Sequence, residues 1–314
     1  MGVGRQLAPC ALGSLLLLLL MATVLAGSFS EAGAARVRVV VAGQGARVAV
    51  DLPPGLSTSE RAALRGAGAY GCRPITLLIV GDSIAMTLGM GLSEGSQAGY
   101  GVTVSDHATL GCDLDAQLQI LDEGVAGRDV QGCEYWRGMW PFLAAAMRPQ
   151  VVALGIGRWE VTDHWFDGRW VHIGERAWDH HVAADLRSVV SIFSGFGAKV
   201  VLLTMPYLDP TTRPNDGLTW SEDMPARTRA YNALVREVAR ADPSRVGVMD
   251  LNRMLSPAGV YTASLDGIDV RSADGIHISP AGGELLQRDI LPEVVRLGLA
   301  DEAERTTAGT RTSR

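Results

Sequence analysis

The chain has 314 residues, of which 47% are hydrophobic and 20% charged, and its formal net charge is -6 with an isoelectric point near 5.5. This length and apolar content suit one globular domain with flanking segments. The sequence contains no run rich in lysine or arginine. Because a nucleic-acid groove needs a basic stripe that displaces counterions from phosphates, the composition argues against nucleic acid as a partner.

The N-terminus has the pattern of a targeting segment. Arg5 precedes an apolar stretch over residues 11–25 that contains six consecutive leucines, and small residues up to Ala26 offer a cleavage site. Residues 1–26 are therefore predicted to be a secretory signal peptide. Counted to residue 27, the stretch reaches about 17 residues, the lower limit for a spanning helix, so an uncleaved membrane anchor is the alternative. Both interpretations place the rest of the chain outside the cytoplasmic membrane.

Residues 27–71 are rich in Gly, Ala and Arg and are predicted to be an N-terminal extension or linker. Two alternating stretches, 36–41 and 46–51, flank a Gly-Gln-Gly turn and predict a β-hairpin. A Pro-Pro-Gly run at 53–55 then interrupts the pattern.

Residues 72–300 are predicted to form the catalytic domain, because apolar β-like runs alternate there with helical patterns. Strands are expected at 75–80, 102–105, 151–154, 199–204 and 246–250, and helices near 84–94, 134–148, 179–195, 222–241 and 280–297. Continuous Val, Ile and Leu strands between helices indicate a parallel sheet that is buried on both faces. The expected fold is an α/β protein, a three-layer α/β/α sandwich with a five-stranded parallel sheet. The polar tail at 301–314 lacks an apolar period and is predicted to be disordered.

The first candidate for catalysis is Ser83, in the sequence Gly81-Asp82-Ser83 at the end of the first strand. A hydroxyl at this strand-to-helix junction faces the crevice where open α/β sheets bind ligands, near backbone N–H groups able to hold an oxyanion. Gly-Asp-Ser also forms ordinary turns and helix N-caps, so this motif alone does not identify a nucleophile.

The second candidate motif is Asp274-Gly275-Ile276-His277, near the far end of the domain. Its spacing lets one short loop present a carboxylate to the imidazole Nδ1–H while Nε2 faces a serine. A helix-capping turn with a solvated histidine is the alternative. The two motifs together predict the nucleophile, base and orienting acid of a serine hydrolase or acyltransferase.

These two motifs resemble the first and last blocks of the SGNH (GDSL-like) hydrolase family, over roughly residues 74–297. The resemblance implies that Ser83 is the nucleophile, His277 the general base and then acid, and Asp274 its orienter. It also implies a flavodoxin-like strand order, 2-1-3-4-5. Gly111 looks like the second-block glycine, whose N–H would join the N–H of Ser83 in the oxyanion hole.

The third block departs from the family pattern. After the strand at 151–154 the chain reads Gly-Ile-Gly-Arg-Trp-Glu, without Gly-x-Asn-Asp. Either Arg158 or a backbone N–H replaces the missing amide, or the hole has two donors, and losing one donor typically costs about 3 kcal/mol. A plain surface arginine is the other interpretation of Arg158. The variant is similar to SGNH domains that accompany acyltransferase-3 membrane proteins in bacterial surface-glycan O-acylation, which implies an acylated glycan substrate and a membrane acyltransferase partner.

The cysteines are expected to pair, because thiols tend to oxidise outside the cytosol. Cys112 and Cys133 flank a polar loop and are predicted to form a disulfide, although Cys72 could replace either one. The chain has no Cys-x-x-Cys or His-Glu-x-x-His pattern. The histidines at 164, 172, 180 and 181 fit no strong ligand motif, so neither a metal nor a cofactor is expected.

All seven tryptophans lie between residues 136 and 220. Indole faces stack on sugar rings, so Trp159 and the neighbouring Glu160 are candidate substrate contacts. The alternative is that these tryptophans fill the core or hold a long loop.

The sequence therefore predicts an exported serine esterase or O-acyltransferase that acts through an acyl-serine on acyl esters of cell-surface carbohydrate. A small-ester or lipid hydrolase of the same fold is one alternative. A non-catalytic glycan-binding domain, suggested by the missing third-block asparagine, is another. The sequence does not indicate the oligomeric state.

Overall fold

The computed structural model describes residues 37–41, 46–50, 74–128 and 133–312. The chain divides into two units, residues 1–73 and 74–314. In the first unit, β1 (Val37–Val41) and β2 (Ala46–Val50) pair antiparallel, which confirms the predicted hairpin. The predicted signal segment and Cys72 lie outside the described residues.

The second unit is built on a five-stranded parallel sheet of order β11-β10-β7-β3-β4. Its strands are β3 (Ile75–Gly81), β4 (Val102–Asp106), β7 (Val151–Gly155), β10 (Lys199–Leu203) and β11 (Val246–Met249). Numbered along the chain these five strands have the order 2-1-3-4-5, which confirms the prediction. The apolar side chains of β3 and β7 are buried on both faces of the sheet, as expected for continuous Val, Ile and Leu strands.

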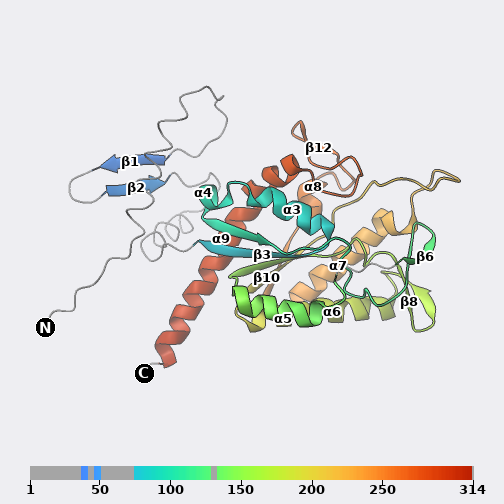
Figure 1. The fold of residues 1–314 in the computed structure, drawn as a ribbon, viewed down its shortest axis with the longest axis horizontal. Coiled ribbons are helices and arrows are strands. Elements are labelled where there is room, and N and C mark those ends of the chain that lie inside the picture. Colours follow the sequence, from blue (N-terminus) through green and yellow to red (C-terminus); the bar gives the residue numbers. More distant parts are fainter. Residues whose placement is uncertain (1–36, 42–45, 51–73, 129–132, 313–314) are drawn as a thin grey trace. The chain divides into compact units, whose positions relative to one another are not determined.

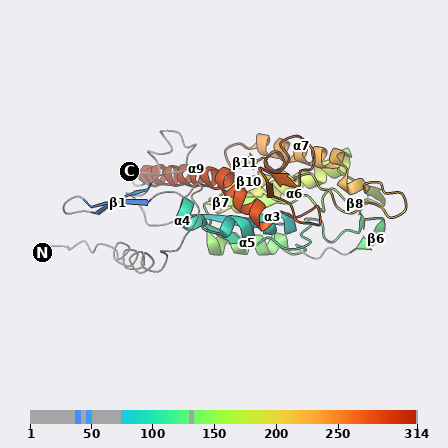
Figure 2. The ribbon, with the colours of Figure 1, turned by 90° about the horizontal axis from the view of Figure 1, so that it is seen from above.

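Helices cover both faces of this sheet, so the three-layer α/β/α prediction is confirmed (Figures 1 and 2). On one face lie α3 (Ser83–Ser93) and α9 (Pro280–Thr312). On the other lie α5 (Trp136–Met147), α6 (Arg176–Gly195) and α7 (Pro225–Ala241). The short helices α4 (Ser96–Tyr100), η1 (Ser221–Asp223) and α8 (Leu251–Leu255) belong to connections.

Helix α9 is longer than predicted and continues to Thr312, through the segment expected to be a disordered tail. The prediction relied on the lack of an apolar period. However, Ala, Glu and Arg in residues 301–305 have high intrinsic helix propensity. In the described part of the chain, no helix has both the length and the apolar character needed to span a bilayer.

A smaller antiparallel sheet, which the sequence did not predict, has the order β6-β5-β8-β9. Its strands are β5 (Ile120–Asp122), β6 (Val125–Arg128), β8 (Asp163–Phe166) and β9 (Arg169–Val171). The first two follow β4 in the chain and the last two follow β7. Because both connections leave the carboxyl ends of parallel strands, the small sheet lies at the carboxyl edge of the main sheet (Figure 1).

The ends of β3 and β7 approach each other closely at two glycines. Gly81 has φ +135°, and a Cβ on it would lie 1.8 Å from the carbonyl oxygen of Gly155. The next residue, Asp82, donates its N–H to that same oxygen at 2.8 Å. Only glycine fits this contact, which fixes the start of α3 beside the third sequence block.

Candidate active site

Ser83 lies at the first position of α3, directly after the carboxyl end of β3. Asp82 is the N-cap, and its Oδ1 accepts the N–H groups of Ile84 at 2.9 Å and Ala85 at 3.2 Å. First-turn N–H groups have no acceptor within their own helix, and they lie at its positive end. The Ser83 N–H is therefore placed to stabilise negative charge next to its own hydroxyl.

The structure brings together the three predicted triad residues. Ser83 Oγ donates to His277 Nε2 at 2.8 Å, across 194 residues of sequence. His277 Nδ1–H donates to Asp274 Oδ2 at 2.7 Å. This chain of hydrogen bonds leaves Nε2 free to accept the serine proton, as a nucleophile and base require.

The loop that carries Asp274 and His277 is held in place from two sides. Gly275 has φ +70°, and a Cβ there would lie 1.9 Å from the carbonyl oxygen of Asp209, so a side chain does not fit. The Asp209 N–H in turn donates to Gly275 O at 3.0 Å. The buried Arg271 donates from Nη2 to the carbonyl of Ile276 at 2.6 Å. These contacts fix the imidazole against the serine.

Asp274 stays ionised at neutral pH. Burial pushes its pKa up, but hydrogen bonds from the His277 ring and from the N–H groups of Ile276 and His277 outweigh burial and lower the pKa to about 2. The side chains of His277 and Asp274 are 27% and 46% exposed. The aspartate end of the triad is therefore accessible to solvent.

Gly111 lies in the turn that follows β4. Cys112 donates its N–H to Thr109 O at 3.2 Å, and the Thr109 N–H donates to Gly81 O at 2.8 Å, which attaches this turn to the nucleophile strand. The Gly111 N–H donates to no backbone or side-chain acceptor within residues 74–128 and 133–312. It is therefore available as the second oxyanion donor. The next residue forms the expected disulfide with Cys133.

Arg158 is buried and only 4% exposed, so the interpretation as a surface arginine is wrong. Its Nη2 lies 3.1 Å from Asp122 Oδ1 and 3.8 Å from Asp223 Oδ1. Its backbone N–H donates to Asp82 Oδ2 at 3.3 Å. The backbone N–H and Nη2 thus hold the site together, whereas Nη1 is buried without a hydrogen-bond partner among the described residues. The Arg158 side chain makes no hydrogen bond or ion pair with the triad within this part of the chain.

Asp82 has a structural role in the turn that carries Ser83. It accepts three backbone N–H groups, those of Ile84, Ala85 and Arg158. Burial nevertheless raises its pKa to about 6. The residue joins the first turn of α3 to the third block.

The structure replaces the predicted substrate-binding role of Glu160 with a structural one. Its side chain lies in the core, 1% exposed, and Oε1 accepts the N–H of Leu114 at 3.3 Å. Burial, with the nearby charges of Asp113 and Asp82, raises the pKa of Glu160 well above its usual value. Trp159 is half-buried, with the Arg158 guanidinium 5.2 Å from its ring centre, and its substrate contact stays a prediction.

Five of the seven tryptophans lie in the core or on the small sheet. Trp136, Trp140 and Trp178 are buried, as the packing interpretation expects. Trp165 on β8 is 42% exposed and meets Trp170 on β9 edge to face, with ring centres 5.4 Å apart. This pair gives the small sheet an aromatic surface.

Three residues that position the site were not found from the sequence: Asp122, Asp223 and Arg271. Asp122 and Asp223 lie far from any motif, and charged residues are usually exposed, so nothing marked them as buried partners. Arg271 lies three residues before Asp274, and this proximity was the one available signal.

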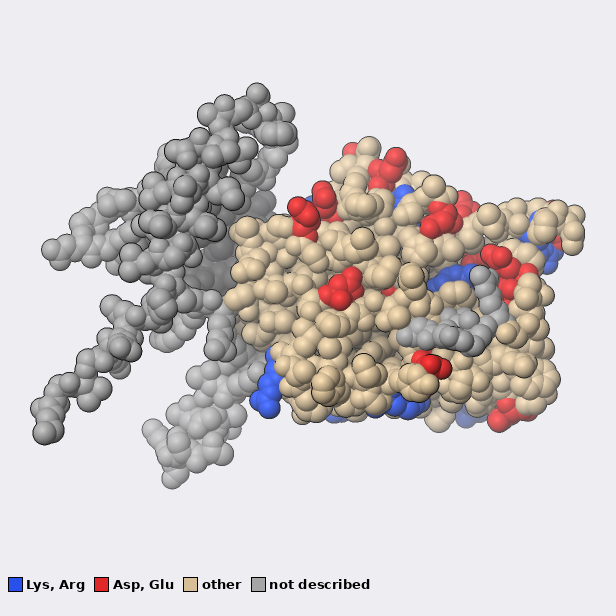
Figure 3. All heavy atoms as spheres, viewed as in Figure 1, with Lys and Arg blue, Asp and Glu red and all other residues tan. Residues whose placement is uncertain are grey.

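Charge on the face drawn in Figure 3 is mixed. Figure 3 shows acidic side chains scattered over the face in view, while basic side chains gather mainly along its lower edge. The described residues form no continuous basic stripe on this face.

This fold and this site define a hydrolase domain of the SGNH type. The family model described as "SGNH domain (fused to AT3 domains)" matches residues 52–292, and the chain belongs to this family. No curated protein matches the chain.

Among solved structures the chain is similar to TesA, with 22% identity, 71% of this chain and 99% of that chain covered, and a TM-score of 0.43. It is also similar to the psychrotrophic esterase EstA from Pseudoalteromonas sp., with 15% identity, coverages of 70% and 96%, and a TM-score of 0.42. A carbohydrate acetylesterase family member from Sinorhizobium meliloti has 16% identity, coverages of 72% and 99%, and a TM-score of 0.45.

Proposed function

We propose that this protein is an exported serine esterase or O-acyltransferase that acts on acyl esters of cell-surface carbohydrate through an acyl-Ser83 intermediate. The observation that carries the proposal is the 2.8 Å contact between Ser83 Oγ and His277 Nε2, with Asp274 behind the imidazole. This is the arrangement that activates a hydroxyl for attack on a carbonyl.

In the first half of the reaction, Ser83 Oγ attacks the ester carbonyl carbon and its proton passes to His277 Nε2. The carbonyl oxygen takes the electron pair of the C=O π bond and accepts hydrogen bonds from the N–H groups of Ser83 and Gly111. The carbon–oxygen bond to the alcohol then breaks, and the alcohol leaves with the proton from Nε2. Asp274 stabilises the imidazolium that forms in between.

In the second half, an acceptor hydroxyl gives its proton to His277 Nε2 and attacks the acyl-serine. The bond between the acyl carbon and Ser83 Oγ then breaks, and Oγ takes back the proton from His277 Nε2. Water as acceptor releases a carboxylic acid, and a sugar hydroxyl yields a new ester. The partial exposure of His277 and Asp274 lets water reach the triad, so we expect hydrolysis from the isolated chain. Transfer would need a partner or a bound glycan that excludes water.

Three observations support a carbohydrate substrate and an extracytoplasmic location. The family is described by its fusion to AT3 domains, which the sequence resemblance connects with surface-glycan acylation. Trp165 and Trp170 present aromatic surface on the small sheet, suited to stacking on a sugar ring. The apolar N-terminus predicts export. A membrane acyltransferase is the partner that this proposal implies.

The test is to treat folded protein with a fluorophosphonate probe and, separately, with an acetylated surface glycan, followed by mass spectrometry of protein and products. We expect labelling at Ser83, loss of acetyl groups and an acyl-Ser83 adduct. Ser83→Ala should abolish all three. Ser93→Ala, an exposed serine of the same helix, is the matched control and should behave like the wild type.

Hydrolysis of p-nitrophenyl acetate by Ser83→Ala at the wild-type rate would refute the nucleophile assignment. A complete lack of Ser83 labelling in folded protein would favour a glycan-binding domain without catalysis. The specific observation behind that second candidate is the third block, where Arg158 is bound to Asp122 in place of the usual asparagine amide. A preference for long-chain esters over acetylated glycan would favour a lipid hydrolase.

A further inference from the structure

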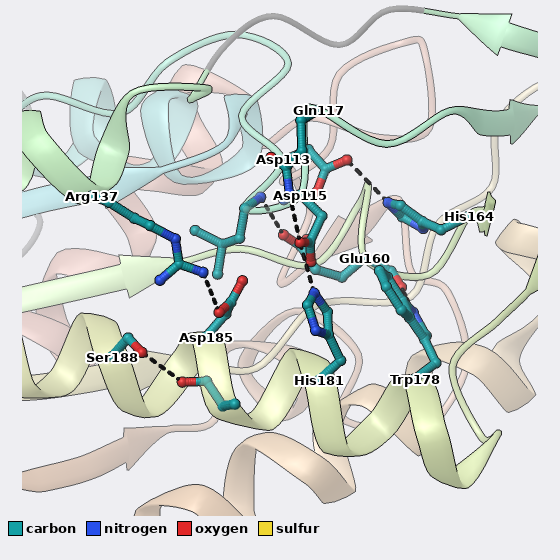
Figure 4. Close-up of polar contacts among 12 residues, drawn as sticks. Asp113, Asp115, Gln117, Arg137, Glu160, His164, Trp178, His181, Asp185 and Ser188 are labelled. Atoms are coloured by element: carbon teal, nitrogen blue, oxygen red, sulfur yellow. Dashed lines mark hydrogen bonds and ion pairs between the residues drawn. The ribbon is translucent and has the colours of Figure 1, made fainter. Parts of the chain in front are cut away.

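A second cluster of titratable side chains, separate from the triad residues, lies between the loop after Gly111 and helix α6. Asp115 comes from the loop, and His181 and Asp185 lie one turn apart on the same face of the helix (Figure 4). One ligand atom from each of these three residues lies within 4.8 Å of the other two. An imidazole and two carboxylates thus converge on one small volume.

The cluster contains a buried carboxylate oxygen without a partner. Asp115 and Asp185 are 1% and 4% exposed. Asp185 Oδ1 accepts from Arg137 at 2.5 Å, but Oδ2 is buried and accepts no hydrogen bond from the described residues. Figure 4 shows the Asp185 carboxylate directed from the helix toward Asp115, with His181 beside it. A buried carboxylate oxygen without a hydrogen-bond partner destabilises the folded state, and a bound ligand would remove this cost.

The carboxylates around this point, those of Asp113, Asp115 and Asp185, outnumber the one arginine, Arg137. His181 Nε2 is 2.8 Å from Asp115 Oδ1, and Arg137 binds Asp185. The adjacent Asp113 is paired with His164 at 3.1 Å and contributes a further carboxylate. Burial raises the pKa of Asp185, and the charge of Asp115 raises it further. A cation between the two carboxylates would offset this excess.

We propose that Asp115, His181 and Asp185 bind one divalent transition-metal ion, for which zinc is the best-suited probe. Zinc accepts one imidazole nitrogen and two carboxylate oxygens at a site completed by water, whereas calcium and magnesium prefer oxygen ligands alone. Coordination uses the lone pair of His181 Nε2, so the proton that now lies between His181 and Asp115 moves to Nδ1 or to solvent.

The ion would be structural and would not touch substrate. Asp115 follows Gly111 and Cys112 in the same loop, so a metal bond to helix α6 would fix the segment that carries the second oxyanion donor. The histidine pattern alone did not predict this site, because two of its three ligands are aspartates and one comes from a distant loop.

The experiment uses full-length protein stripped of metal with a chelator and then titrated with zinc chloride or calcium chloride. We expect one equivalent of zinc per chain and, at 100 times Kd, a rise in Tm of about 5–10 °C. His181→Gln and Asp185→Asn should each weaken zinc binding by at least about 10-fold. The matched control is His180→Gln, an exposed histidine of the same helix, which should bind zinc like the wild type.

Either of two results would overturn the proposal: wild-type protein that takes up no zinc, or variants that bind it as tightly as the wild type. The cluster would then be two buried ion pairs that hold the loop to the helix. X-ray absorption of the zinc-loaded wild type avoids any folding defect in the variants. One imidazole with oxygen ligands is expected, and a spectrum without imidazole would also refute the assignment.

Discussion

Replacing Arg158 with methionine tests whether this arginine is a structural cation. Methionine keeps much of the side-chain length but removes the charge that faces Asp122 and Asp223. Both carboxylate oxygens of Asp223 are buried and accept no hydrogen bond from the described residues. Without the guanidinium, Asp223 loses the ion pair that offsets its burial.

Removing one partner of a buried ion pair costs about 3–5 kcal/mol. For a domain of this size Tm changes by roughly 2–4 °C per kcal/mol, so we expect Arg158→Met to lower Tm by roughly 6–20 °C. Urea unfolding followed by tryptophan fluorescence gives the free energy of unfolding, and calorimetry gives Tm.

Two further variants control this measurement. Arg187→Met changes an exposed arginine of α6 and should alter the free energy of unfolding by less than about 0.5 kcal/mol. Arg158→Met combined with Asp223→Asn removes the charges of Arg158 and Asp223, leaves that of Asp122, and should recover part of the loss. An Arg158→Met variant that is as stable as the wild type but has lost its esterase activity would refute the structural role, because Arg158 would then be an oxyanion donor.

Three other predictions concern the triad acid, the disulfide and the buried carboxylates. Asp274→Asn should lower kcat/KM for p-nitrophenyl acetate by about 10²- to 10⁴-fold, because an amide does not hold the Nδ1–H tautomer; an unchanged value would contradict the triad. Replacing both Cys112 and Cys133 with serine should lower the free energy of unfolding by about 3 kcal/mol in urea, and equal midpoints would show that the bond is dispensable. Burial raises the pKa of Asp223 from 3.8 to about 6. Between pH 3.8 and about 6 the folded state therefore binds more protons at Asp223 than the unfolded state does. The free energy of unfolding should thus increase as the pH falls from about 7 to about 4. Asp223→Asn should flatten this increase, while the part due to Asp82, whose pKa is also about 6, remains.

The main sheet and the triad were predictable because their signals are local. The central strands β3, β7 and β10 are mainly apolar runs, and each catalytic motif occupies four residues or fewer. The small sheet was not predictable, since β5 and β9 have three residues each and β8 mixes Asp, His, Trp and Phe. Such strands are defined by their pairing with distant segments, which a single sequence does not show.

The burial of Arg158 and Glu160 could not be predicted from the sequence for a related reason. Charged residues are exposed in most proteins, so a sequence pattern assigns them to the surface or to a substrate. Here both are buried and have polar partners from distant segments. Arg158 donates to Asp122 of the small sheet, and Glu160 accepts the N–H of Leu114 from the loop after β4. Only the folded chain brings these partners together.

The hydrogen bond between the Arg158 N–H and Asp82 has a consequence for how this domain can diversify. It couples the start of the β7–β8 connection to the helix turn that presents the nucleophile, so changes near Arg158 would disturb the chemistry itself. The outer strands, with Trp165 and Trp170, lie beyond that link. Substitutions or insertions in these strands would therefore leave the hydrogen bonds among Ser83, His277 and Asp274 in place, and under the proposed function they would be the changes that alter substrate preference.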